Sequence, residues 1–173
     1  MTMEIRKTRP EDIDAAAAIY EQAKAYMKAQ GVQQWQWGYP DRETVVNDVA
    51  DGHGYVVTDD DKIVGVCYIT EAPEATYAVI ENGSWLNDEP YVSVHRTAVA
   101  NEAKGKGVGS WFFAEAERYA RARGYKNLRV DTHPDNHSMQ RLIEKNGFTA
   151  CGRIYIPREN NGPRIAYQKV LAD

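Results

Sequence analysis

Residues 94–111 read VHRTAVANEAKGKGVGSW and carry the clearest pattern in this chain of 173 residues. The pattern predicts a strand rich in β-branched residues, a short polar turn, three glycines at alternate positions and an amphipathic helix. Glycines let the backbone turn tightly and let a ligand approach it without interference from a Cβ. The N–H groups of such a loop lie at the positive end of the helix dipole, where anions bind. We therefore predict an anion cradle at Gly105, Gly107 and Gly109, suited to a phosphate or pyrophosphate.

Two other phosphate-binding loops fit this stretch less well. A P-loop needs Gly-x-x-x-x-Gly-Lys before Ser or Thr, and Ala100 stands five residues before Gly105. A dinucleotide loop needs Gly-x-Gly-x-x-Gly directly after a strand, with an acidic residue about 20 residues on. The three glycines are spaced one residue too tightly for that loop, and residues 100–104 separate them from the strand. Asp131 keeps the dinucleotide alternative open, but too few elements follow it for a doubly wound sheet.

The glycine stretch is similar to a known cofactor loop. Residues 104–109, KGKGVG, resemble the Arg/Gln-x-x-Gly-x-Gly/Ala loop that binds acetyl-CoA in the GNAT N-acetyltransferases, with Lys104 where Arg or Gln is usual. Residues 136–148, NHSMQRLIEKNGF, resemble a second element of that family, an Asn, a helix and a Gly-Phe that enters a strand. The resemblance covers nearly the whole chain. It implies transfer of an acetyl group from acetyl-CoA to an amine of a small molecule or peptide, and family habit suggests a homodimer.

Composition and length limit the classes of protein to which this chain can belong. The net charge is −4, which argues against non-specific binding to nucleic acid. No apolar run approaches the length of a membrane span, and we expect no signal peptide before the strand at Ile5. Cys67 and Cys151 lack metal-ligand spacing and are expected to be reduced, buried thiols of a cytoplasmic protein. The length fits one domain, and the resemblance implies a single GNAT-like N-acetyltransferase domain over residues 1–173.

Hydrophobic periodicity gives the expected order of elements. An antiparallel meander with two helices is followed by a β-α-β-α-β-β tail, the order expected of a GNAT domain. The resemblance therefore implies an α/β (α+β) fold with a mixed, mostly antiparallel central sheet flanked by helices. In the second helix, which starts at Asp41, we expect Val45, Val46 and Val49 to face the core. The other expected elements are a strand at Ile5, a helix over 13–27, strands over 55–58, 63–70 and 91–99, a helix from 108 to Gly124, a strand over 128–131, a helix from 136 and strands over 148–155 and 165–170.

The resemblance also assigns residues to the cofactor. Backbone N–H groups near the end of the central strand would address the thioester and the pantetheine arm. The glycine loop would hold the pyrophosphate, and Asn136 would bond the pantetheine arm. The cofactor-binding residues are then Thr97, Ala98, Val99, Lys104, Gly105, Lys106, Gly107, Val108, Gly109, Ser110 and Asn136.

The acceptor amine must lose a proton to a base. His95 is our candidate, because an imidazole accepts a proton near neutral pH and period-2 alternation places it on the strand face of Ser93 and Thr97. The alternative role for His95 is a half-buried strand residue bonded to a neighbour. Glu71, just past the second hairpin strand, is the rival base.

The departing thiolate has no obvious proton donor. The family uses a Tyr where this chain has Ile143, and Ile cannot donate a proton. Tyr155 is a weak substitute, because Tyr also serves well as a strand residue. The chain could therefore be a GNAT-fold module that binds CoA with little or no turnover. A dinucleotide-dependent oxidoreductase is the third alternative.

Two further clusters remain. The loop QQWQWGYP, residues 33–40, carries Trp35, Trp37 and Tyr39, and the family uses this region to cover the acceptor site, so these three are the candidate substrate-binding residues. Ordinary packing over the sheet is the alternative. Residues 131–137 look superficially like a metal cluster, but a proline and a strand-to-helix change break tetrahedral geometry. A helix cap at Asp135 or Asn136 explains them better, so we expect no metal.

Overall fold

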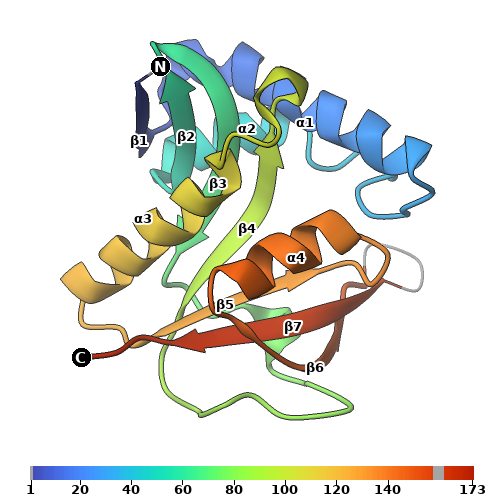
Figure 1. Cartoon of the computed structure of the whole chain (residues 1–173), viewed down its shortest axis with the longest axis vertical. Coiled ribbons are helices and arrows are strands. Elements are labelled where there is room, and N and C mark those ends of the chain that lie inside the picture. The colour runs from blue at the N-terminus through green and yellow to red at the C-terminus, as the bar shows by residue number, and fades with distance from the viewer. Residues whose placement is uncertain (1, 158–161) are drawn as a thin grey trace. The chain divides into compact units, whose positions relative to one another are not determined.

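Hydrogen bonds join the strands in the order β1-β2-β3-β4-β5-β7-β6 in this computed structural model, which describes residues 2–157 and 162–173. The ladders β1–β2, β2–β3, β5–β7 and β6–β7 are antiparallel, whereas β4 and β5 run parallel. The predicted mixed, mostly antiparallel sheet flanked by helices is therefore confirmed (Figure 1). The chain folds as two units, residues 1–69 with 95–115 and residues 70–94 with 116–173.

The predicted elements are all present, with bounds shifted by a few residues. The strands are β1 Met3–Lys7, β2 Gly54–Asp59, β3 Lys62–Thr70, β4 Val92–Val99, β5 Asn127–Thr132, β6 Thr149–Tyr155 and β7 Pro163–Val170. The helices are α1 Ile13–Ala29, α2 Arg42–Asp51, α3 Val108–Ala122 and α4 His137–Lys145. Short 3-10 helices lie at Pro10–Asp12, Ala75–Tyr77 and Asn101–Ala103. Within the described ranges, no helix combines the length and apolar character needed to cross a membrane.

The first unit places helices on both faces of β1–β3. A Cβ at Gly65 of β3 would lie 2.8 Å from Phe112 and 2.8 Å from Val108 of α3. A Cβ at Gly54 of β2 would instead meet Asp48 of α2 at 3.1 Å. Gly65 pairs with Val57, three residues along β2 from Gly54, so the two glycines face opposite sides of the sheet. Figure 1 shows α3 in front of these strands and α1 and α2 behind them.

The inward face of α2 differs from the expected one. Asp41 caps the helix, since its carboxylate accepts from Thr44 N at 3.0 Å and from the Thr44 hydroxyl at 2.9 Å. Val45 is buried as predicted, but Val46 is 37% exposed and Asp48 is buried instead. The prediction for Val46 was wrong because a buried carboxylate occupies the core-facing position that an apolar residue usually takes.

The second unit holds β5, β7 and β6, the helix α4 and the irregular segment between β3 and β4. Tyr77 packs with Ile154 and Ala166, and Trp85 and Tyr91 lie against that group. The segment touches β6 so closely that its backbone admits no side chain there. A Cβ at Gly83 would lie 1.9 Å from Cys151 O, and one at Gly152 would lie 2.6 Å from Glu81 O.

Candidate cofactor and acceptor site

The glycine loop leads into α3 in the first unit. Gly105 and Gly107 have φ of +81° and +80°, and no heavy atom lies within 4 Å of a Cβ built on either. Both positions favour glycine because of the left-handed backbone, and the space beside them is open. Gly109 differs, because it lies in the first turn of α3. The first N–H groups of a helix have no carbonyl partner within it, so the loop and the start of α3 together offer N–H donors to an anion.

The lysine at the head of this loop has a partner. Lys104 Nζ lies 3.4 Å from the centroid of the Tyr26 ring on α1. A cation above an aromatic face is held by the negative charge density of the ring. Partial burial lowers the pKa of the Lys104 ammonium. The side chain therefore braces the loop against α1.

A left-handed residue interrupts β4 beside the candidate base. Arg96 has φ of +53° and lies between His95 and Thr97. Regular alternation of side chains requires extended backbone throughout, so the expectation that His95 and Thr97 share a face does not carry across Arg96. The ring of His95 lies 6.5 Å from that of Tyr68 on β3, and His95 is half-buried.

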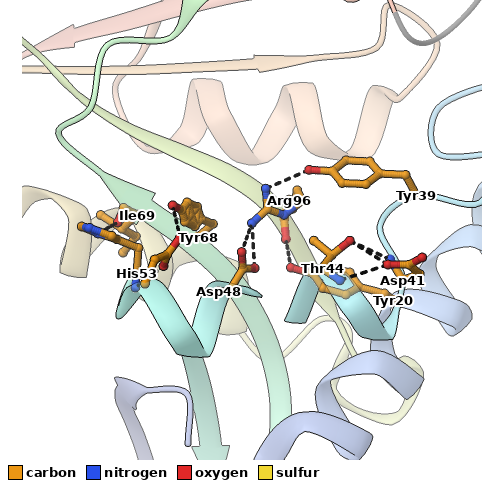
Figure 2. A network of polar contacts seen from close by, with 10 residues as sticks. Tyr20, Tyr39, Asp41, Thr44, Asp48, His53, Tyr68, Ile69 and Arg96 are labelled. Atoms are coloured by element: carbon orange, nitrogen blue, oxygen red, sulfur yellow. Dashed lines mark hydrogen bonds and ion pairs between the residues drawn. The ribbon is translucent and has the colours of Figure 1, made fainter. Parts of the chain in front are cut away.

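Five side chains of the first unit converge on this left-handed turn. We call Tyr20, Tyr39, Asp48, Tyr68 and Arg96 the Arg96 cluster (Figure 2). Arg96 Nη2 donates to both oxygens of Asp48, at 2.7 and 2.6 Å, and Arg96 Nη1 donates to the hydroxyl of Tyr39 at 2.9 Å. The guanidinium lies 4.5 Å from the centroid of the Tyr68 ring. The Tyr20 hydroxyl donates to the carbonyl of Arg96 at 3.0 Å, so both the backbone and the side chain of Arg96 are held.

Burial dominates the electrostatics of the cluster. Burial works against the Arg96 charge, but Tyr20, Tyr39 and Asp48 outweigh it and raise the pKa of the guanidinium. Burial raises the pKa of the Asp48 carboxyl, and Arg96 opposes that shift. Burial also raises the pKa of the Tyr20 hydroxyl. The arginine is therefore a fixed positive charge, and this fully buried tyrosine is a neutral hydrogen-bond donor.

The aromatic loop divides into an inner and an outer part. Trp35 is buried and packs edge-on against Tyr20 with the ring centroids 5.7 Å apart. Trp37 is 56% exposed, and Tyr39 is half-buried with its hydroxyl on Arg96. Packing therefore accounts for Trp35, and among the three aromatic residues of this loop Trp37 and Tyr39 are the two that keep exposed surface.

The second unit holds the remaining candidates. Tyr119 of α3 donates a hydrogen bond to the carboxylate of Glu71, the rival base. Ile143, at the usual place of the acid, is fully buried in α4, whereas Tyr155 of β6 is 48% exposed. Glu71, Asn136 and Tyr155 belong to the second unit. His95, the glycine loop and the aromatic loop share the first unit.

Asn136 has a structural use. Its side-chain oxygen accepts from Met139 N at 3.2 Å and caps α4. The cap predicted at Asp135 or Asn136 is therefore confirmed for Asn136. His133 Nδ1 accepts from Asp135 N at 3.0 Å, which ties down the turn before the helix. Among the described residues, no group of three or more His, Cys, Asp or Glu is placed to hold a metal.

The sequence interpretation missed Arg96 and Asp48. An arginine in the predicted central strand is a usable signal, because arginine is almost never buried unless it is paired. Its partner was also visible in principle. Asp48 lies three residues after Val45 and so on the same face of α2.

Comparisons with known proteins agree with this geometry. The model of the acetyltransferase (GNAT) family matches residues 16–148. A GNAT-family acetyltransferase from Streptococcus agalactiae 2603 is 30% identical over 99% of this chain and 96% of that one, with a TM-score of 0.88. An N-acetyltransferase from Staphylococcus aureus Mu50 (18% identity, 99% and 100% coverage, TM-score 0.70) and Salmonella typhimurium yncA, solved with its cofactor acetyl-CoA (17%, 100% and 96%, 0.70), share the fold. No curated protein matches the chain.

Proposed function

Because the chain belongs to the GNAT acetyltransferase family, we propose that it is an N-acetyltransferase, which moves the acetyl group of acetyl-CoA to an amine of a small molecule or peptide. The observation that carries this proposal is the open glycine loop with two left-handed glycines before α3. We also propose that residues 1–173 make one such domain. A cytoplasmic location and a homodimer stay predictions.

The loop suits the pyrophosphate of acetyl-CoA on physical grounds. The space beside Gly105 and Gly107 is clear, so phosphate oxygens can reach backbone N–H groups there. Lys106 and Ser110 add a positive charge and a hydroxyl to the same stretch of chain, and Lys104 adds a second positive charge while its ammonium contacts Tyr26. The thioester of acetyl-CoA supplies the activated acetyl group, and N–H groups of residues 97–99 would stabilise charge that develops on its carbonyl oxygen.

His95 would accept the proton of the amine. It is half-buried, lies on β4 next to the fixed Arg96 turn, and shares a unit with the glycine loop and with Trp37 and Tyr39. Glu71 is less suited as a base, because its carboxylate already accepts a hydrogen bond from the Tyr119 hydroxyl. The thiolate would leave with a proton from Tyr155 or from water.

The buried Ile143 favours a second candidate function, a GNAT-fold module that binds CoA. Without a tyrosine at this position, the chain would bind CoA with little or no turnover. The experiment that decides between the two functions is the release of free thiol from acetyl-CoA across a panel of small amines and peptide N-termini. N-acetyltransferase activity predicts amine-dependent thiol release, and a binding module predicts acetyl-CoA binding without it.

A thermal-shift arm removes the third alternative. Stabilisation of the protein by acetyl-CoA but not by NAD supports the proposed cofactor, because a ligand that binds only the folded state raises the melting temperature. Stabilisation by NAD alone would contradict the proposal.

A further inference from the structure

The Arg96 cluster connects the aromatic loop, the candidate acceptor-binding region, with β4, the strand that carries the candidate base His95. The geometry points to Arg96 as a positioning residue, which holds the aromatic loop, residues 33–40, against β4 and so fixes the acceptor-binding surface beside His95. This inference rests on the proposed function, which supplies the acceptor amine. It depends on Arg96 and Asp48, to which neither the sequence motifs nor the family likeness gave a role.

The first step is the backbone of Arg96. A non-glycine residue at φ of +53° is strained, and such strain persists only where surrounding contacts over-determine it. Here the contacts come from three elements: Tyr20 of α1 holds the carbonyl, Asp48 of α2 holds the guanidinium, and Tyr68 of β3 lies over its face. The direction in which His95 and Thr97 leave the turn therefore depends on these contacts.

The second step is the loop. Its start is fixed independently, because Val32 N donates to Met27 O at 2.8 Å and Gln36 Nε2 donates to Lys24 O at 3.1 Å. Trp35 is held by its ring contact with Tyr20. The later part is joined to β4 through the hydroxyl of Tyr39 on Arg96 Nη1, as Figure 2 shows. Trp37, the exposed aromatic residue of the loop, lies between these two anchored parts.

The third step is the choice of arginine. A planar guanidinium donates in several directions at once and stacks on aromatic rings, whereas a lysine ammonium is a compact point charge. Arg96 uses Nη2 on Asp48, Nη1 on Tyr39 and its face on Tyr68. A lysine at position 96 keeps the charge opposite Asp48 but cannot make all three contacts.

These steps separate the effects of Arg96 from those of the glycine loop. Loss of the Tyr39–Arg96 bond loosens residues 37–40 and leaves the ion pair with Asp48 in place. Acceptor binding then suffers. Acetyl-CoA binding does not, because the glycine loop is braced by Lys104 on Tyr26 and by Asn101 N on Gln22 at 2.9 Å.

The test uses Tyr39→Phe, which removes one hydroxyl, and Tyr125→Phe as the matched control. Tyr125 follows α3 in the second unit and belongs neither to the Arg96 cluster nor to the candidate site. Arg96→Lys is the second variant. Each full-length protein is measured by hydrogen exchange of residues 31–41, by the dissociation constant of acetyl-CoA, and by KM and kcat for the best amine of the panel.

We expect faster exchange of residues 31–41 in Tyr39→Phe and a fall of about tenfold in kcat/KM for the amine, the size expected for a lost hydrogen bond to a charged group. The acetyl-CoA dissociation constant should stay at the wild-type value, and Tyr125→Phe should match wild type throughout. Arg96→Lys should show a larger loss of kcat/KM for the amine, because it disturbs all three contacts of the guanidinium.

Unchanged exchange in Tyr39→Phe overturns the proposal, and so does faster exchange with unchanged amine kinetics, which would leave the bond a purely structural role. An equal loss of acetyl-CoA affinity in Tyr39→Phe also overturns it. Failure of the proposed function looks different, because the wild-type protein itself then acetylates no amine.

Discussion

The Lys104 ammonium lies 3.4 Å above the centre of the Tyr26 ring, so the lysine of the glycine loop contacts α1. Because of this contact, neighbouring residues of the glycine loop have different roles. The lysine braces the loop, and the backbone of Gly105, Gly107 and the first turn of α3 is left to meet an anion.

The first prediction compares two glycines with nearly the same backbone. Gly107 and Gly124 have φ of +80° and +79°, and a Cβ at either meets no heavy atom within 4 Å. Gly107→Ala and Gly124→Ala should therefore lose similar stability, about 1–2 kcal/mol. Of these two variants, only Gly107→Ala should weaken acetyl-CoA binding, measured by calorimetry. Lys104→Ala should have a smaller effect than Gly107→Ala, and equal affinities in all three variants would refute the anion cradle.

The second prediction separates two uses of Asn136. Asn136→Ala removes the cap of α4 and should cost about 1 kcal/mol of stability. Asn136→Asp keeps the capping oxygen but removes the amide N–H groups. A role in holding the pantetheine arm predicts a raised KM for acetyl-CoA in both variants. An Asn136→Asp enzyme with wild-type KM would assign the residue to capping alone.

The third prediction concerns His95 and the pH dependence of the reaction. A general base must be unprotonated, so activity should rise with pH through an apparent pKa in the neutral range. His95→Gln should lower kcat by about 10²-fold or more and abolish that dependence, while acetyl-CoA affinity is retained. A variant with near-normal turnover and the wild-type pH profile would eliminate His95 as the base.

The fourth prediction is the loss of stability in acid that comes from Asp12. Burial raises the pKa of this carboxyl, but hydrogen bonds from Arg6, at 2.6 Å, and from Arg9 N outweigh it and lower the pKa below 3.8. A lowered carboxyl pKa stabilises the fold above the unfolded-state value, and the contribution is lost as the pH falls below about 4. Asp12→Asn should therefore cost about 2 kcal/mol at pH 7.

Urea unfolding at pH 7 and at pH 3 checks this, because the difference between wild type and Asp12→Asn should shrink in acid. Asp14→Asn is the matched control. The side chain of Asp14 is 86% exposed in its ion pair with Arg42, and exposed pairs contribute little. A constant difference at both pH values would contradict the assignment.

Local signals were enough to predict most of the fold. The helix predicted from residue 108 to Gly124 is present as α3. Its apolar residues at helical spacing are buried, because a 3.6-residue period identifies one face of a helix without knowledge of its partner: Val108, Phe112, Ala116, Tyr119 and Ala120. The hairpin of β2 and β3 turns at Asp60 and Asp61, both left-handed. Aspartate tolerates that backbone better than most residues, so the sequence at this turn suits the hairpin.

The Arg96 cluster could not be predicted in the same way. Its members come from α1, the aromatic loop, α2, β3 and β4, and only tertiary structure brings them together. The prediction from apolar residues alone placed Val46 in the core and gave Asp48 no role. The structure reverses that order because the buried charge of Arg96 needs a carboxylate within hydrogen-bond distance.

The burial of both cysteines decides how acetyl transfer can be followed. Cys67 and Cys151 are free and buried, and burial raises the pKa of both thiols. Only a thiolate reacts quickly with disulfide reagents, so the folded protein is nearly silent to a thiol-detecting dye at neutral pH. The colour that develops during turnover then counts CoA molecules alone, and a slow extra signal of at most two thiols per chain marks unfolded protein in the same cuvette.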